Sequence, residues 1–341
     1  MKVGVLTGGG DCPGLNAVIR AVVRAAYQKK WEVVGFRHGW KGIVKNEQMK
    51  LDLSAVSGVL PRGGTILGTS RTNPYKDPKM LESLKQTFKD EKLDALVAIG
   101  GEDTLGVANK LAQEGLPVVG VPKTIDNDLN ATDYTFGFDT AVNIATECID
   151  RLHTTAESHD RVMVTEIMGR HAGWITLHAG LAGGADFILL PEFAVSVDEV
   201  CDVIRKRHQR GKTFSIVAVS EGAKVEGLGE VLQTQEKDAF GHVRLGGIGQ
   251  TLSKIIEEKT GFETRYTVLG HIQRGGSPTA FDRVLGTRFG VKAIELVEQK
   301  KWGYMVSLKG VDITSVKIQD AVGQLKVVSK ELYDMARIFF G

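Results

Sequence analysis

Residues 123–128 combine one cation, one hydroxyl and two carboxylates in six positions, directly after the apolar run 116–122. Such a run has the composition of a buried strand. In an open parallel sheet, ligands bind outside the carboxyl ends of the strands, so a polar loop in this place suits a reactive site. A second apolar run, 93–99, ends in the same way at residues 100–104. We therefore expect the two loops to be neighbours in space.

The first of these loops has the groups that phosphoryl transfer requires. Strand alternation would put Thr124 and Asp126 on one side of the chain. One carboxylate is then available to take a proton from an attacking alcohol, while Asp128 could hold a metal ion. The alternative is an Asx-type turn, which explains one aspartate and leaves the other without a role.

The second loop places Glu102 and Asp103 at the start of an expected helix. Their oxygens are plausible Mg²⁺ ligands, and the hydroxyl of Thr104 is a possible donor beside them. The alternative is helix capping, because acidic residues are common in a first helical turn for dipole reasons alone.

Several other segments suit phosphate groups. Residues 8–14, which include Gly10, lie between an expected strand and helix, where amides and the helix dipole can hold an anion. Their spacing matches neither the G-x-G-x-x-G fingerprint nor a Walker A loop, and a plain structural turn is the alternative.

Arg71 ends the glycine-rich segment 63–71 and is suited to bridging two phosphates, although it could be a solvated loop arginine. Arg170 follows an expected strand and could address a phosphate at a helix start.

Residues 270–276 collect a histidine and an arginine, His271 and Arg274, and Arg265 lies on the preceding expected strand. Arginine binds phosphate through two parallel hydrogen bonds, and imidazole can donate to the same oxygens. This cluster suits a sugar phosphate.

Strands and helices alternate along the whole chain, which predicts an α/β protein with two Rossmann-like three-layer lobes, mainly parallel sheets, and an active site in the cleft between them. The expected strands are 3–7, 32–37, 93–99, 117–121, 161–167, 214–219 and 263–269. The expected helices are 15–27, 78–89, 104–113, 140–157, 171–181, 197–210, 249–260, 279–298 and 330–339. We expect residues 1–138, with the C-terminal part 305–341, to form the larger donor-binding lobe, and residues 139–304 to form the smaller lobe. Residues 222–247 read as an inserted hairpin or surface excursion.

The composition excludes several classes of protein. The net charge of +2 is spread evenly, without the basic stripe that sequence-independent binding to nucleic acid requires. Three cysteines at scattered spacing predict neither a zinc motif nor a disulfide and fit a reducing cytoplasm. No apolar run approaches the ~18 residues of a membrane helix, and a strand that begins at Lys2 leaves no room for a signal peptide. We expect a soluble, untargeted protein.

The order of motifs resembles the 6-phosphofructokinases of the bacterial type. From residue 3 to about 287 the chain carries GGGDCPGLNA, GGTILGTSR, GGEDT, KTIDND, MGRHAGW, SEG and GHIQRGG in the sequence order of that family. Each motif alone is weak, whereas the ordered set is highly specific. The resemblance implies transfer of a phosphoryl group to the 1-hydroxyl of fructose 6-phosphate, with Mg²⁺ as cofactor.

The resemblance also assigns roles to residues. Asp126 matches the base and Thr124 the hydroxyl beside it, Arg71 and Arg170 match cations that stabilise the transferring group, and Gly10 lies in the loop that cradles that group. Glu102 and Asp128 match the Mg²⁺-binding positions. The positions that match the sugar-phosphate site are Thr124, Asp126, Arg161, Met168, Gly169, Arg170, Glu221, Arg265, His271 and Arg274. In the family, Arg161 and Arg265 reach in from a neighbouring subunit, which implies a homodimer or homotetramer.

Two departures from the family pattern concern the phosphoryl donor and regulation. ATP-using members carry glycine where this chain has Asp103 and Lys123, and this pair resembles the pyrophosphate-using branch. Asp103 would crowd and repel the α-phosphate of a nucleotide, while Lys123 could pair with pyrophosphate. An ATP-dependent kinase with the same acceptor is the alternative.

The effector site of the family is matched by Arg20, Arg24 and Lys212. Leu53 and His153 replace expected arginines at this site, which predicts weak control by nucleoside diphosphate or phosphoenolpyruvate.

Two functions of other classes fit less well. A non-catalytic nucleotide-binding module would have a damaged acid or phosphate cluster, and none is damaged here. A nicotinamide-dependent oxidoreductase would need the G-x-G-x-x-G fingerprint and an acidic residue after the second strand, where the chain has Arg37.

Overall fold

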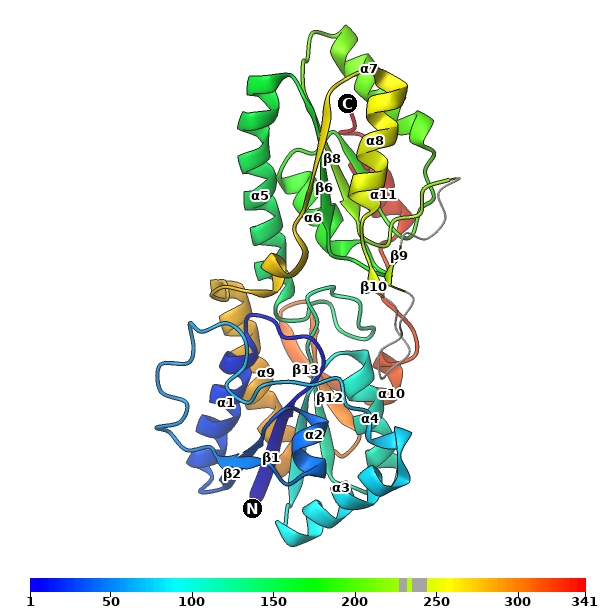
Figure 1. Cartoon of the computed structure of the whole chain (residues 1–341). Coiled ribbons are helices and arrows are strands. Elements are labelled where there is room, and N and C mark those ends of the chain that lie inside the picture. Colours follow the sequence, from blue (N-terminus) through cyan, green and yellow to red (C-terminus); the bar gives the residue numbers. More distant parts are fainter. Residues whose placement is uncertain (227–231, 235–243) are drawn as a thin grey trace.

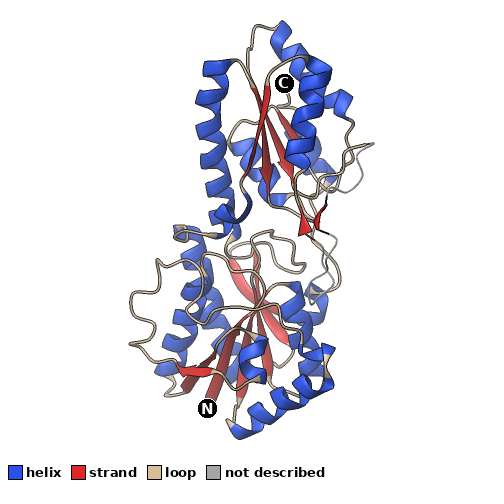
Figure 2. Ribbon diagram, in the orientation of Figure 1, coloured by secondary structure: helices blue, strands red, loops and turns tan. Residues whose placement is uncertain are grey.

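The computed structural model describes residues 1–226, 232–234 and 244–341 of the chain. Two lobes, each built on its own mainly parallel sheet, lie end to end (Figure 1). Helices cover the sheets on both faces (Figure 2). The predicted fold class, α/β with two three-layer lobes, is confirmed.

The first lobe has a seven-stranded sheet in the order β13-β12-β5-β4-β1-β2-β3. Its strands are β1 (Lys2–Thr7), β2 (Glu32–Phe36), β3 (Gln48–Lys50), β4 (Ala95–Gly100), β5 (Val118–Pro122), β12 (Tyr304–Lys309) and β13 (Asp312–Lys317). The pairs β2/β3 and β12/β13 are antiparallel, and the other pairs are parallel. Successive residues of a strand point to opposite faces, and both faces of the central strands are buried in separate apolar clusters.

Helices α1 (Leu15–Gln28) and α9 (Ala280–Glu298) cover one face of this sheet. The other face is covered by α2 (Trp40–Val44), α3 (Pro78–Asp90), α4 (Glu102–Gln113) and α10 (Ile318–Ala321). A short 3₁₀ helix, η1, spans Pro74–Lys76.

The second lobe has a four-stranded parallel sheet in the order β11-β6-β8-β7. Its strands are β6 (Val162–Ile167), β7 (Phe187–Leu189), β8 (Ser215–Ser220) and β11 (Thr264–Val268). Helices α5 (Phe138–His159) and α6 (Trp174–Ala182) pack on one face, and α7 (Val197–Gln209) and α8 (Ile248–Thr260) pack on the other. The 3₁₀ helix η2 (Gly270–Arg274) and the C-terminal helix α11 (Lys330–Arg337) complete this part of the chain.

Two elements lie in the lobe opposite to the one we expected. Helix α9, assigned to the smaller lobe by the 139–304 boundary, packs against α1 of the first lobe. Gly286 and Gly290 allow this close approach, since a Cβ at Gly290 would lie 2.6 Å from the carbonyl oxygen of Val18. The C-terminal helix α11, expected on the first lobe, packs on the second, where the hydroxyl of Tyr333 donates to the carbonyl oxygen of Ile188 at 3.0 Å.

The expected insertion at 222–247 is only partly described. Strands β9 (Leu232–Thr234) and β10 (Arg244–Leu245) pair in an antiparallel manner, and residues 227–231 and 235–243 lie outside the described part of the chain. Within residues 1–226, 232–234 and 244–341, no helix has both the length and the apolar composition needed to cross a membrane.

Candidate functional site

Three loops of the first lobe meet at the carboxyl ends of adjacent strands. Strands β5, β4 and β1 are neighbours in the sheet, and each continues into one of the polar segments singled out above. The amide of Gly8 donates to the carbonyl oxygen of Ile99 at 2.9 Å, and the amide of Lys123 donates to that of Gly100 at 2.9 Å. The prediction that the loops after β4 and β5 are neighbours is confirmed.

Lys123 connects the loop after β5 to the loop after β1. Its side chain is buried, and its Nζ donates to the carbonyl oxygen of Gly10. Burial lowers the pKa of this ammonium, and the carboxylates of Asp11 and Asp126 act in the opposite direction. The predicted donor-site cation is therefore held against the loop that is predicted to cradle a phosphate.

Thr104, in the first turn of α4, is buried against the same loop. A Cβ at Gly8 would overlap the side chain of Thr104, and so would a Cβ at Gly100. These two glycines therefore let the strand ends approach the start of α4 closely. Glu102 and Asp103 lie in the same first turn, where a carboxylate is favoured by the helix dipole.

Asp126 faces inward from the loop after β5. Its amide donates to the Oγ1 of Thr124 at 3.0 Å, and its Oδ1 is buried with no hydrogen-bond partner among the described residues. Burial raises the pKa of this carboxyl, while the positive charges of Arg274, Lys123 and His171 oppose the rise. The carboxylate thus has an acceptor oxygen without a hydrogen-bond partner among the described residues, and the positive charges near it favour its ionised form. Both properties suit a proton acceptor.

Asp128 and Glu102 lie close enough to influence each other. Burial raises the pKa of Asp128 to about 7, and the negative charges of Asp126 and Glu102 add to the rise. A divalent cation would offset this repulsion, so the two predicted ligands fit a metal ion. No cluster of three or more His, Cys, Asp or Glu side chains with metal-binding geometry occurs in the described ranges. Two carboxylates, with substrate phosphates as further ligands, are a common arrangement for Mg²⁺.

Arg274 lies between the predicted donor loop and the sugar-phosphate residues. It comes from η2, and its Nη1 donates to the carbonyl oxygen of Asp11 at 3.3 Å. A Cβ at Gly10 would lie 2.6 Å from the same nitrogen, so glycine at position 10 leaves room for the guanidinium. His271, three residues earlier on η2, is exposed.

The second lobe presents a group of predicted sugar-phosphate residues at the carboxyl ends of β6 and β8. The amide of Glu221 donates to the carbonyl oxygen of Ile167 at 2.8 Å. The amide of Gly222 donates to the carbonyl oxygen of Gly169 at 3.2 Å. A Cβ at Gly222 would overlap the carbonyl oxygen of Arg170, which requires glycine in the S-E-G motif. Met168 precedes these residues, and its amide donates to the Oε1 of Gln273 at 3.4 Å.

Glu221 links the two lobes electrostatically. Burial raises the pKa of its carboxyl to about 7, and the negative charge of Asp126 is the next cause. The positive charge of Arg274 opposes this rise. The predicted base and the predicted sugar-binding groups therefore face one common region, to which both lobes contribute.

Three predicted residues lie away from the centre of this region or at its surface. Arg161 and Arg265 both contact Glu263, with distances of 2.8 Å and 2.5 Å to its Oε1. Arg161 precedes β6, whereas Met168 follows it, so the length of the strand, about 20 Å at 3.3 Å per residue, separates the two. Arg71, on the loop after β3, has an exposed side chain.

Sequence reasoning gave no role to Lys326, whose amide donates to the carbonyl oxygen of Asp128 at 2.8 Å. Its segment is a stretch of mixed composition before the last helix, and no spacing or motif marks it. The contact joins residues far apart in the chain, so only the fold reveals it.

Comparisons with known proteins agree with this geometry. The chain matches the family model described as Phosphofructokinase over residues 2–297. It is 60% identical, over 342 residues and 100% of both chains, to the "Pyrophosphate--fructose 6-phosphate 1-phosphotransferase" of Amycolatopsis methanolica. It is 52% identical, over 343 residues and again 100% of both chains, to the "ATP-dependent 6-phosphofructokinase" of Mycobacterium leprae (strain TN).

A solved structure has the same fold. The pyrophosphate-dependent phosphofructokinase from Nitrosospira multiformis superposes with a TM-score of 0.85 at 22% identity, over 100% of this chain and 91% of that chain.

Proposed function

The chain belongs to the phosphofructokinase family, and from this premise we propose that it transfers a phosphoryl group from pyrophosphate to the 1-hydroxyl of fructose 6-phosphate. The products are fructose 1,6-bisphosphate and inorganic phosphate, a reversible glycolytic step. The observation that carries the donor assignment is the buried ammonium of Lys123 against the carbonyl oxygen of Gly10. A compact charge in that position pairs with a small polyanion such as pyrophosphate and occupies space that a nucleotide would need.

The reaction needs one proton acceptor and several cations. Asp126 takes the proton of the 1-hydroxyl, the sugar oxygen forms a bond to the terminal phosphorus, and the bridging P–O bond of pyrophosphate breaks. The electron pair of that bond leaves with the phosphate product. Arg71 and Arg170 stabilise the charge on the transferring group, and Thr124 stays beside Asp126 through the hydrogen bond to its amide.

The carboxylates of Glu102 and Asp128 would hold Mg²⁺. When bound there, the ion would supply positive charge that offsets the negative charge of the phosphates. Burial raises the pKa of Asp128 to about 7, with smaller contributions from the charges of Asp126 and Glu102, and a bound cation would favour its ionised form.

Met168, Gly169, Arg170, Glu221, His271 and Arg274 are the proposed sugar-phosphate contacts from the same chain. Arg161 and Arg265 are proposed to complete the site of a neighbouring subunit in a homodimer or homotetramer. The length of β6, which separates Arg161 from Met168, and the contact that both arginines make with Glu263 support this proposal.

An ATP-dependent kinase is the second candidate, and the relative from Mycobacterium leprae favours it. The difference between the two donors depends on Asp103 and Lys123. Asp103 lies in the first turn of α4, close to the buried Thr104, where it would repel the α-phosphate of ATP.

Initial rates on fructose 6-phosphate with Mg²⁺, measured with pyrophosphate and with ATP at equal concentration, test the proposal. We expect turnover with pyrophosphate and little or none with ATP. Turnover with ATP alone would contradict the donor assignment, and turnover with neither would contradict the function. Removal of divalent ions by a chelator should abolish the pyrophosphate-dependent rate, and added Mg²⁺ should restore it.

We also propose a cytoplasmic location and weak effector control. The three cysteines, Cys12, Cys148 and Cys201, are unpaired thiols, as a reducing compartment maintains them.

The proposal of weak effector control rests on the two residues that replace expected arginines. One of them, His153, forms a hydrogen bond between its Nε2 and the carbonyl oxygen of Gly183 at 2.7 Å. Titration with a nucleoside diphosphate or phosphoenolpyruvate should leave half-saturation by fructose 6-phosphate nearly unchanged.

A further inference from the structure

A short segment, residues 323–328, runs from the first lobe to the second and touches both loops of predicted metal ligands. We refer to it as the strap. It follows α10 and precedes α11, the helix that packs on the second lobe (Figure 1). The strap therefore crosses between the lobes next to the region where the reaction is proposed to occur.

The first half of the strap holds the two carboxylate loops. The amide of Gly323 donates to the Oε1 of Glu102 at 3.2 Å. Leu325 forms an isolated antiparallel bridge with Leu129, and the amide of Lys326 donates to the carbonyl oxygen of Asp128 at 2.8 Å. Each loop is thus tied to the strap at or beside a predicted ligand.

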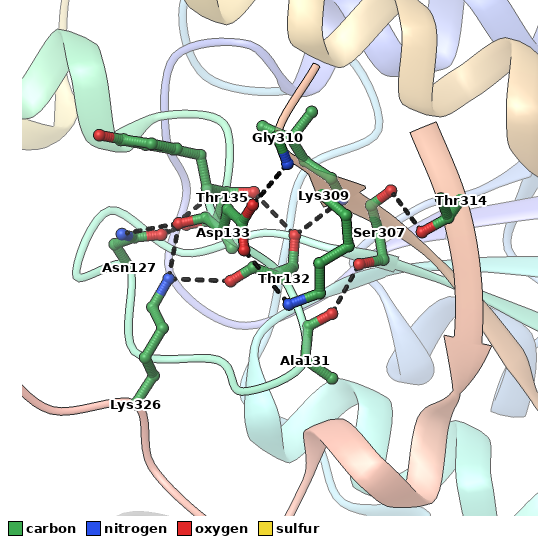
Figure 3. A network of polar contacts seen from close by, with 12 residues as sticks. Asn127, Ala131, Thr132, Asp133, Thr135, Ser307, Lys309, Gly310, Thr314 and Lys326 are labelled. Atoms are coloured by element: carbon green, nitrogen blue, oxygen red, sulfur yellow. Dashed lines mark hydrogen bonds and ion pairs between the residues drawn. The ribbon is translucent and has the colours of Figure 1, made fainter. Parts of the chain in front are cut away.

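The side chain of Lys326 extends this contact along the loop after Asp128. Its Nζ donates to the carbonyl oxygens of Thr132 and Asp133, at 2.9 Å and 2.8 Å (Figure 3). The same stretch is bound from the other side, because Asp133 accepts from the amide of Gly310 at 2.7 Å and from Lys309 at 3.2 Å (Figure 3). Lys326 therefore links the strap to a loop that the β12/β13 hairpin also supports.

The second half of the strap reaches the second lobe. The indole Nε1 of Trp174 donates to the carbonyl oxygen of Lys326 at 2.8 Å, and the Nζ of Lys326 lies 5.6 Å from the centre of the Trp174 ring. The amide of Val328 donates to the Oε1 of Glu192 at 2.9 Å, and the same oxygen accepts from the amide of Gly173 at 2.9 Å. Gly173 and Trp174 end the segment that contains Met168 and Arg170, both predicted to bind the sugar phosphate.

We propose that Lys326 is a positioning residue, which holds the Asp126–Asp128 loop at a fixed place relative to the sugar-phosphate residues of the second lobe. The inference rests on the proposed function, since it concerns how the two substrates meet. Lys326 itself touches no predicted substrate group. Its effect comes from connecting the backbone of the base and metal loop to Trp174, so that the base meets a hydroxyl bound mainly by the other lobe. Such alignment matters because small displacements of reacting groups cost about 100-fold in rate.

Lys326→Met tests the proposal, because methionine keeps the apolar stem and removes the three donors. We expect kcat for pyrophosphate-dependent transfer to fall by about 10- to 100-fold, with the KM for fructose 6-phosphate nearly unchanged. Lys326→Arg should recover most of the rate, since a guanidinium can donate to both carbonyl oxygens. Lys301→Met is the matched control. Lys301 lies 5.8 Å from the ring of Tyr304 in a similar cation–aromatic contact, away from the strap, and its replacement should leave kcat unchanged.

A second measurement does not depend on turnover. Hydrogen–deuterium exchange of residues 124–136 should be faster in Lys326→Met than in the wild type and unchanged in Lys301→Met. If Lys326→Met does not fold, Trp174→Phe is the second variant, since it keeps an aromatic ring and removes the indole N–H that donates to the carbonyl oxygen of Lys326. It should change kcat and exchange in the same direction and by a smaller factor. Wild-type kcat or wild-type exchange in the folded Lys326 variant would overturn the inference. A wild-type protein without activity would overturn the proposed function, and the exchange measurement would still decide the role of Lys326.

Discussion

At the scale of single residues, the electrostatic balance around Asp126 determines how well it can act as a base. Burial raises its pKa, whereas Arg274, Lys123 and His171 act against this rise. The cations therefore favour the ionised form that accepts a proton. An uncharged amide in the same position would keep the shape of the side chain and lose this capacity.

Asp126→Asn should reduce turnover by on the order of 10²- to 10⁴-fold, because general base catalysis is lost while the side-chain volume is kept. Steady-state kinetics with pyrophosphate and calorimetric binding of fructose 6-phosphate measure the two effects separately. Binding should be retained. Turnover equal to that of the wild type would remove Asp126 as the base.

The donor site depends on two residues that can be changed together. Lys123→Gly removes the hydrogen bond to Gly10 and the buried charge, and should reduce kcat/KM for pyrophosphate by roughly 10- to 100-fold. Addition of Asp103→Gly should remove the repulsion of the α-phosphate and raise kcat/KM for ATP.

The ratio of kcat/KM values for the two donors, measured in both single variants and the double variant, checks this prediction. Lys110→Gln, on the exposed side of α4, serves as the control and should leave the ratio unchanged. A double variant with the wild-type ratio would show that other residues select the donor.

At the scale of secondary-structure elements, the N-termini of α5 and α9 are joined side by side. Asp282 of α9 accepts from the amide of Thr140 of α5 at 2.8 Å and from its hydroxyl at 2.5 Å. Thr279, the N-cap of α9, donates to the Oδ2 of Asp139 at 2.6 Å. Each helix thus supplies polar partners to the first turn of the other, where free amides and the helix dipole favour acceptors. This junction connects the lobes, since α9 packs in the first and α5 in the second.

The junction has a predictable pH dependence. Burial raises the pKa of Asp282 to about 6, well above its ordinary value of 3.8. A carboxyl that binds its proton more tightly in the folded state stabilises that state at low pH. The free energy of unfolding should therefore fall as pH rises from 4 to 6, by up to about 3 kcal/mol from this group.

Asp282→Asn should remove this dependence, because an amide does not titrate and can still accept from Thr140. Urea unfolding of the wild type and the variant at several pH values between 4 and 7 measures the difference in stability between them. We expect the variant to gain stability relative to the wild type as pH rises. Asp198→Asn is the control, since the pKa of that exposed carboxyl is lowered and it titrates below this window. Parallel pH profiles for the wild type and Asp282→Asn would contradict the prediction.

At the scale of the whole molecule, Arg161 and Arg265, which both contact Glu263, are the residues that we propose to complete the site of a neighbouring subunit. Strand β11 is the edge strand of its sheet, and its Arg265 side chain is 51% exposed. Exposed cations on an edge strand are available to a neighbouring copy of the chain. In the proposed assembly, each site combines Asp126 of one subunit with Arg161 and Arg265 of another.

Mixing two inactive variants tests this arrangement. Asp126→Asn and Arg265→Ala should each have low activity, and hybrid oligomers formed after joint unfolding and refolding should regain activity. The recovery follows because a hybrid contains sites in which an intact Asp126 meets an intact Arg265 from the other chain. The mixture of Asp126→Asn with Lys123→Gly is the control, because both changes fall in the part of the site contributed by one chain. Equal recovery in both mixtures, or none in the first, would contradict a shared site.

The lobes themselves were predictable in large part. The strands and helices that we expected in the first lobe, such as β1, β4, α1 and α3, lie within one or two residues of the observed bounds, because their apolar periodicity is local. The order of motifs was sufficient to identify the family. Strands β3, β7, β12 and β13 were not anticipated. The three-residue strands β3 and β7 carry little periodicity, while β12 and β13 form a hairpin in which β12 pairs with β5, a contact that no local pattern indicates.

The sequence alone determined which residue types stand at the strand ends, because those residues are adjacent in the chain and their chemistry does not depend on the fold. The tertiary structure decided which of them meet and how they are held. Lys123 reaches Gly10, α9 joins the first lobe, and Gly323 contacts Glu102 across 221 positions of the chain. Such contacts form between residues that no local pattern relates, because they are set by the packing of whole elements.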